Sequence, residues 1–232
     1  MTMGGTTLPT MGWSMIRRFR HIAALLAATL MLGACSSGSD DPFVQEYESL
    51  NGEEARGGRA YLELDIRDEH RFRPSSEDEI RNLLDDGDGA IYFGFPECPW
   101  CRSAVGPMDE AAEAVNLDEI HYLNVSEIRD QKSVNASGDV IVTDEGTDFY
   151  GFLLDELGDF APEYPDVPGE RRILVPLVAI VVGGEIVDSH LGTVESQTDP
   201  YEGMTDEQRT ELIDLYREKF SQIPGCGEFY CE

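Results

Sequence analysis

The apolar positions along the chain predict a mixed α/β domain. Runs typical of strands occur at residues 61–65, 90–95, 120–125 and 139–144, and two more flank the Gly183-Gly184 turn. Residues 90–95 are almost entirely apolar, as in a strand that is buried on both faces of a sheet. The pattern therefore predicts a central sheet whose last two strands form a hairpin.

Helical periodicity appears between these strands. Ser76 and Glu79 have the spacing of a capping box, which predicts a helix that extends to about Leu84. Three further helices are predicted at residues 104–115, 148–160 and 204–220. Alternating strands and helices indicate an α/β fold with helices on the faces of the sheet.

The first 34 residues have the layout of an export signal. Three arginines precede the apolar run 22–32, which is too short to span a bilayer as a permanent helix. The run ends in Leu-Gly-Ala-Cys, which resembles the lipobox of bacterial lipoproteins. That resemblance implies removal of residues 1–34, lipidation of Cys35, and a cell-membrane location on the extracytoplasmic face. The alternative is an ordinary signal peptide followed by a chance cysteine.

The segment that follows is small, polar and acidic. Residues 35–58 contain few large apolar side chains, so we expect a flexible acidic tether there. Residues 59–232 are long enough to form one domain with a good core.

Net charge narrows the choice of partners. The formal charge is −29 at pH 7, and removal of a signal with three arginines and no acid would make it −32. Such a surface repels the phosphates of nucleic acid, so a nucleic-acid-binding function is excluded.

The number and spacing of the cysteines indicate the chemistry of the candidate site. If Cys35 is lipidated, four cysteines remain, and an even number in an exported protein favours disulfide chemistry. Cys98 and Cys101 enclose Pro-Trp where a buried strand ends and a long helix begins. The N-terminus of a helix stabilises a thiolate, so Cys98 is the candidate attacking thiol. Cys101, one turn further, is placed to resolve the mixed disulfide.

The downstream half adds a resemblance to the thioredoxin superfamily. Pro176, the hairpin around Gly183-Gly184, Gly192 and the last helix follow the order found in that family. The closest resemblance is to the thioredoxin-like bacteriocin transport accessory protein group, over residues 60–222. It implies a thioredoxin-like fold with a central mixed sheet and an insertion, residues 126–172, before the cis-proline strand.

The resemblance also implies the site. Val175–Pro176 would be a cis peptide bond opposite the dithiol, and Trp100, Val175 and Pro176 would contact the substrate. The sequence departs from ordinary thioredoxin because Tyr92 stands where the buried aspartate would be. Two charges beside the motif act in opposite directions, since Glu97 would raise the Cys98 pKa and Arg102 would lower it.

Other interpretations compete with the redox dithiol. Cys226 and Cys231 could join Cys98 and Cys101 in a four-cysteine zinc site, although a small structural disulfide or a second redox pair at Cys226 and Cys231 are alternatives. The fold could also serve as a non-catalytic binding or transport-accessory module. The insertion either shapes a partner surface or lengthens a crossover helix, and we favour the second.

We predict from these observations a membrane-tethered thiol–disulfide oxidoreductase. It would need no cofactor beyond its own dithiol. Its partners would be exported protein thiols or disulfides and a further redox protein, and we expect a monomer.

Overall fold

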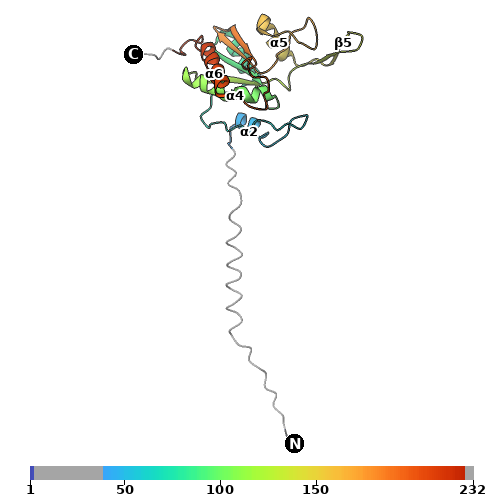
Figure 1. Ribbon diagram of the computed structural model, residues 1–232, viewed down its shortest axis with the longest axis vertical. Helices are drawn as coiled ribbons and strands as arrows, with labels where there is room; N and C mark the ends of the chain where they lie inside the picture. Colours follow the sequence, from blue (N-terminus) through green and yellow to red (C-terminus); the bar gives the residue numbers. More distant parts are fainter. Residues whose placement is uncertain (3–38, 228–232) are drawn as a thin grey trace, which may run out of the picture. The chain divides into compact units, whose positions relative to one another are not determined.

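The computed structural model describes residues 1–2 and 39–227. The chain divides into two units, Met1–Gly38 and Ser39–Glu232, and the fold described here is that of the second (Figure 1). The predicted signal peptide, the predicted lipidation site Cys35 and the C-terminal Cys231 lie outside the described residues.

A five-stranded mixed sheet forms the centre of this unit. Its order is β1-β3-β2-β6-β7. The strands are β1 (Phe72–Pro74), β2 (Gly89–Gly94), β3 (Ile120–Asn124), β6 (Leu177–Val182) and β7 (Glu185–Leu191). Both β1 and β2 are parallel to β3, whereas β6 is antiparallel to β2 and β7.

Helices cover both faces of the sheet. On one face α4 (Pro99–Ala114) packs beside α6 (Asp206–Phe220), and on the other lie α3 (Glu77–Asp86) and α5 (Asp148–Leu157) (Figure 1). The central strand β2 contributes to the apolar core on each face of the sheet. Tyr92 lies in the core formed with α4 and α6, and Phe93 lies in the core formed with α3 and α5. The predicted mixed α/β architecture, with helices flanking a central sheet, is confirmed.

Local signals in the sequence explain where the helices begin. Ser76 and Glu79 form the predicted capping box at the start of α3, and Thr205 with Gln208 forms a second one before α6. Acidic residues fill the first turn of both helices, where they stabilise the helix dipole.

The predicted strand at residues 61–65 is absent. The backbone there is bonded to side chains: Asn51 donates to the Leu64 carbonyl at 2.6 Å and accepts from the Leu64 N–H at 2.9 Å. Leu64 and Ile66 still pack against the core that contains α4. The alternating pattern thus identified the buried face, while side-chain partners replaced a neighbouring strand.

The prediction of a flexible tether over residues 35–58 is wrong for the part that the structure describes. Residues Pro42–Glu48 form the helix α2, which Asp41 caps by accepting from the Phe43 and Val44 N–H groups. Phe43 and Tyr47 are fully buried, and the Phe43 ring stacks on Phe72 of β1 with centroids 4.4 Å apart. The three buried apolar residues of α2, Phe43, Val44 and Tyr47, suffice to dock the helix, although the segment is polar overall.

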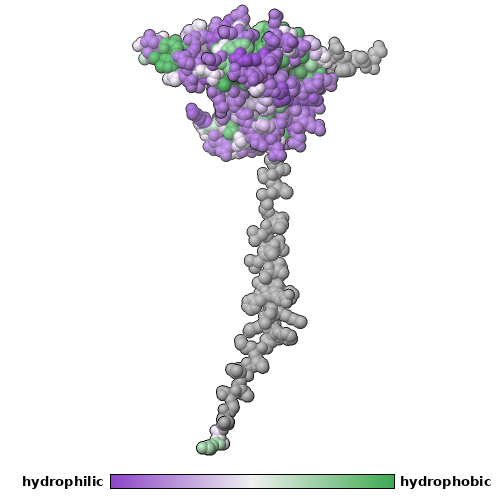
Figure 2. Space-filling model, turned by 180° about the vertical axis from the view of Figure 1, so that it is seen from behind, coloured by the Kyte–Doolittle hydropathy of each residue, from purple (hydrophilic) through white to green (hydrophobic). Residues whose placement is uncertain are grey.

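The insertion between β3 and β6 has two parts. Helix α5 and a short 3₁₀ turn (Gly158–Phe160) occupy the predicted helical region and pack on the sheet. A hairpin of β4 (Gln131–Val134) and β5 (Val140–Asp144) extends away from the sheet (Figure 1). Its valines and isoleucine form an exposed apolar patch on a mostly hydrophilic surface (Figure 2). The insertion therefore adds an apolar hairpin beside the expected helix.

Candidate active site

Cys98 occupies the N-cap position of α4, directly after the loop that follows β2. Its sulfur accepts a hydrogen bond from the Cys101 N–H at 3.3 Å. Pro99 begins the helix, where its missing N–H costs nothing. Cys98 is buried, with only 7 % of its surface exposed.

Cys101 lies one turn further into α4 and is fully buried. The two thiols have opposite acidities. Hydrogen bonding to Cys101 lowers the pKa of Cys98, and the N–H groups of Cys101 and Trp100 add to this effect against the burial of the sulfur. Burial raises the pKa of Cys101 well above its ordinary value, and its interaction with Cys98 raises it further. The dithiol thus contains one activated and one protected thiol.

The loop before β6 faces this pair. The Val175–Pro176 peptide bond is cis, as the resemblance implied. The Cys98 thiol donates to the Val175 carbonyl at 3.7 Å, so residues 77 positions apart in the sequence meet at the reactive sulfur. Val175 and Trp100 are half-buried, whereas Pro176 is buried. The predicted site residues of the motif and of this loop are therefore brought together.

The charges beside the motif differ from the prediction. Arg102 points away from Cys98 and is 1 % exposed. Its guanidinium donates to the Tyr47 carbonyl at 2.6 Å, to the Leu62 carbonyl and to the Asn51 side chain. Arg102 therefore holds the N-terminal segment against α4, and its predicted role at the thiol is wrong.

Arg129 supplies the positive charge instead. It lies after β3, at the start of the insertion, and its guanidinium stacks 4.7 Å from the centre of the Phe95 ring. Its charge lowers the pKa of Cys98. Asp130, beside it, forms a buried ion pair with Arg172 at 3.1 Å, which fixes the base of the insertion. Arg129 could not be predicted from the sequence, because only the fold brings the insertion to the dithiol.

Buried tyrosines surround Cys101. The Tyr92 hydroxyl lowers the otherwise raised pKa of Cys101 and lies 2.8 Å from the Tyr47 hydroxyl. Tyr122 of β3 interacts with Tyr47 and donates to the Glu46 carboxylate at 3.1 Å. From the sequence, Tyr92 is recognisable only as the residue that replaces an aspartate. Tyr47 and Glu46 were not predicted as site residues, because the segment that carries them was expected to be a tether.

Cys226 lies at the opposite end of α4 from the dithiol. The N–H of its neighbour Gly227 donates to Val115, which caps the C-terminus of α4. A helix of this length spans roughly 25 Å, so one zinc ion cannot bind both Cys226 and the dithiol. The four-cysteine zinc site is therefore wrong, and no group of three or more potential metal ligands clusters elsewhere in the described residues.

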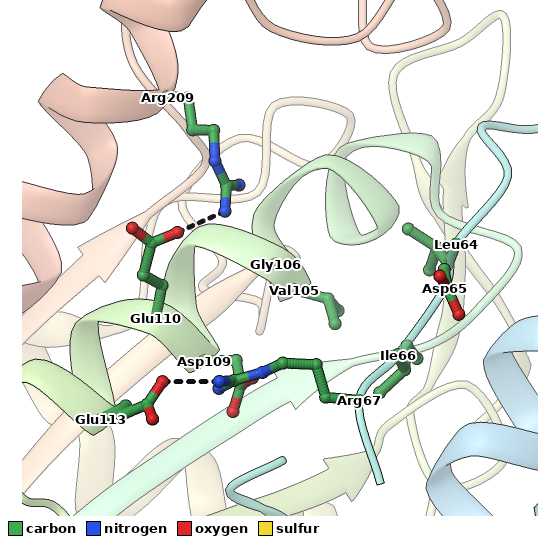
Figure 3. Close-up of a pocket in the computed structure, with 10 residues that line it drawn as sticks. All are labelled: Leu64, Asp65, Ile66, Arg67, Val105, Gly106, Asp109, Glu110, Glu113 and Arg209. Atoms are coloured by element: carbon green, nitrogen blue, oxygen red, sulfur yellow. Dashed lines mark hydrogen bonds and ion pairs between the residues drawn. The ribbon is translucent and has the colours of Figure 1, made fainter. Parts of the chain in front are cut away.

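A cleft of about 490 Å³ lies on another part of the surface. It is bounded by residues 64–67, by α4 and by Arg209 of α6, and ion pairs of Arg67 with Asp109 and of Arg209 with Glu110 line it (Figure 3). Neither cysteine of the motif lines this cleft. Cys98 instead contacts the Val175 carbonyl.

Comparison with known proteins finds no matching family model, no matching curated protein and no matching solved structure. Within the described residues, none of the helices has the length and apolar character needed to cross a membrane.

Proposed function

We propose that this protein is a thiol–disulfide oxidoreductase with a thioredoxin-like fold. The observation that carries the proposal is the asymmetry of the dithiol: Cys98 has a lowered pKa at a helix N-cap, while Cys101 is fully buried. The strand order and the position of the Val175–Pro176 loop opposite Cys98 support the fold assignment.

The reaction begins at Cys98, the thiol whose pKa is lowered. With a disulfide substrate, the Cys98 thiolate attacks one sulfur, forms a mixed disulfide and releases the other sulfur as a thiolate. Cys101 then loses its proton and attacks Cys98, which closes the Cys98–Cys101 disulfide and releases the second substrate thiolate. Two electrons pass to the substrate, and the reverse sequence oxidises a dithiol. The reduction potential of the couple decides the direction in the cell.

The substrate is an exported protein, and the enzyme is tethered to the membrane through lipid on Cys35. The lipobox-like residues before Cys35 support this location. Mass spectrometry of the mature N-terminus tests it, since Cys35→Ser abolishes the lipid. An unlipidated N-terminus in the wild-type protein would refute the anchor.

Trapping tests the chemistry. Cys101→Ser removes the resolving thiol, so partner proteins accumulate as mixed disulfides on Cys98 and disappear when reductant is added. The matched control is the Cys98→Ser/Cys101→Ser double variant, which retains the surface but has no attacking thiol. Adducts are read on non-reducing gels. A non-catalytic binding module predicts an empty trap with both variants.

A further inference from the structure

The buried position of Cys101 raises the question of where its proton goes. The thiol is fully buried and its pKa is raised, yet it must become a thiolate before it attacks Cys98. Water has little access to a group with no exposed surface. A proton acceptor within the protein is therefore required, and Tyr92 occupies the position that the resemblance assigned to an aspartate.

Hydroxyl groups run outward from Cys101 through three elements. The first is Tyr92 of β2, whose hydroxyl interacts with the Cys101 thiol. The second is Tyr47 of α2, with its hydroxyl oxygen 2.8 Å from that of Tyr92. The third is Tyr122 of β3, whose ring packs edge-on against Tyr47 with centroids 5.8 Å apart and whose hydroxyl donates to Glu46 at 3.1 Å. All three tyrosines are at most 2 % exposed.

Glu46 lies at the outer end of this series. Its carboxylate also accepts from the Asn124 side chain, which fixes its orientation. Burial raises the pKa of Glu46, with further increases from Glu97 and Glu127, so the carboxylate binds a proton more readily than an exposed glutamate. Since Glu46 is only half-buried, it can exchange that proton with solvent.

We propose that the hydroxyls of Tyr92, Tyr47 and Tyr122 form a proton relay that carries the Cys101 proton to the carboxylate of Glu46. The inference rests on the proposed oxidoreductase function and assigns the base for its second step. The helix α2, which supplies Tyr47 and Glu46, is then part of the catalytic apparatus.

The transfer is balanced. The Cys101 proton moves to the Tyr92 oxygen as the Tyr92 proton moves to Tyr47, the Tyr47 proton to Tyr122 and the Tyr122 proton to Glu46. Each tyrosine stays neutral, and the net change is one thiolate at Cys101 and one carboxylic acid at Glu46. The thiolate then attacks Cys98, whose bond to the substrate sulfur breaks with the electron pair leaving on the substrate.

Several titratable groups face this path and contribute to its pH dependence. Those around Cys101 are Cys98, Tyr47, Tyr92, Tyr122 and, from α6, Tyr216. Those around Glu46 are Tyr122, Glu97 and Glu127. Tyr216 is also fully buried, but its hydroxyl has no hydrogen-bond partner within the described part of the chain. It therefore provides a matched control, because Tyr216→Phe removes a nearby hydroxyl that is outside the relay.

The test follows the two steps separately in the full-length reduced protein. The protein is mixed with 5,5′-dithiobis(2-nitrobenzoate), quenched with acid at set times, and digested for peptide mass spectrometry. The thionitrobenzoate adduct on Cys98 reports the attack, and its loss to the Cys98–Cys101 disulfide reports resolution. Identification by peptide separates this pair from the other cysteines.

We expect Tyr92→Phe and Glu46→Gln to slow resolution at neutral pH by about tenfold or more and to raise its apparent pKa. Adduct formation on Cys98 should keep its wild-type rate. Glu46→Gln retains an oxygen that can accept from Tyr122 and Asn124, so its effect reports lost proton acceptance rather than lost packing. Because the groups act in series, the double variant should be no slower than Tyr92→Phe alone.

Unchanged pH profiles in Tyr92→Phe and Glu46→Gln would overturn the relay, as would an equal effect of Tyr216→Phe. Failure of the proposed function looks different. In that case the wild-type protein itself forms no adduct on Cys98, or forms one that Cys101 never resolves.

Discussion

The hydrogen bonds of Arg102 hold residues 42–64 against α4, so replacing Arg102 tests this docking through the free energy of unfolding. Replacing it with methionine keeps an apolar side chain of similar length and removes the guanidinium. The Tyr47 and Leu62 carbonyls then lose their charged donor, whereas the Asn51 oxygen still accepts from the Leu64 N–H. The buried Tyr47 carbonyl and the carbonyl of the half-buried Leu62 are thus left without this partner.

The magnitude follows from these contacts. Each buried acceptor that loses its partner costs about 1–3 kcal/mol, which gives roughly 2–6 kcal/mol for two. The variant also avoids burying a charge, a cost seen in the burial that lowers the pKa of Arg102. We therefore expect a net loss of about 2–4 kcal/mol, a large part of the stability of an ordinary domain.

Urea unfolding of wild-type and Arg102→Met protein measures this difference, and hydrogen exchange over residues 42–64 shows whether the loss is centred on that segment. Arg209→Met is the control, because this exposed arginine pairs with the exposed Glu110 and should change stability by less than about 1 kcal/mol. An Arg102→Met variant as stable as Arg209→Met, with normal exchange over residues 42–64, would refute the reasoning.

Three further predictions concern charge and hydrogen bonding. Arg129→Gln removes the cation that lowers the Cys98 pKa, so alkylation of Cys98 near neutral pH should slow several-fold. Iodoacetamide labelling followed by peptide mass spectrometry measures this rate, and an unchanged rate would contradict the role of Arg129. The capping box lowers the pKa of Glu79 from 4.5 to about 2. Wild type should therefore be more stable than Glu79→Gln above pH 4.5 and should lose that advantage as the pH falls towards 2. Unfolding experiments across this pH range measure the difference, and a constant difference would argue against the linkage. Tyr216→Phe should raise the free energy of unfolding by about 1 kcal/mol because the buried hydroxyl has no partner in the described residues, and destabilisation would reveal a partner.

Much of the central sheet could be predicted because its strands carry strong local signals. The apolar run that became β2 and the hairpin of β6 and β7 are recognisable without tertiary information. The first strand, β1, could not be found in this way. It has only three residues, and Phe72 is its single buried apolar side chain, so its pairing with β3 depends on the assembled core.

The dithiol could be located from its spacing and its place between a strand and a helix. Its electrostatic surroundings could not. Arg102 is adjacent to Cys101 in sequence, yet its side chain points to Tyr47, whereas Arg129 acts on Cys98 from a distant segment. Sequence proximity does not give side-chain direction within a helix, because successive residues point to different faces.

If Cys35 carries the proposed lipid, the docked helix α2 would limit how far the domain can move from the membrane. If Cys35 carries lipid, only residues 36–41 separate it from Pro42, where α2 begins. An extended chain covers at most about 3.6 Å per residue, so this linker is at most about 25 Å long. A tether that ended at residue 58 could instead reach more than about 80 Å. The linker from Cys35 to α2 is shorter than the diameter of such a domain, roughly 40 Å. The proposed oxidoreductase would then reach only a thin layer next to the bilayer, and only cysteines that enter that layer would meet Cys98.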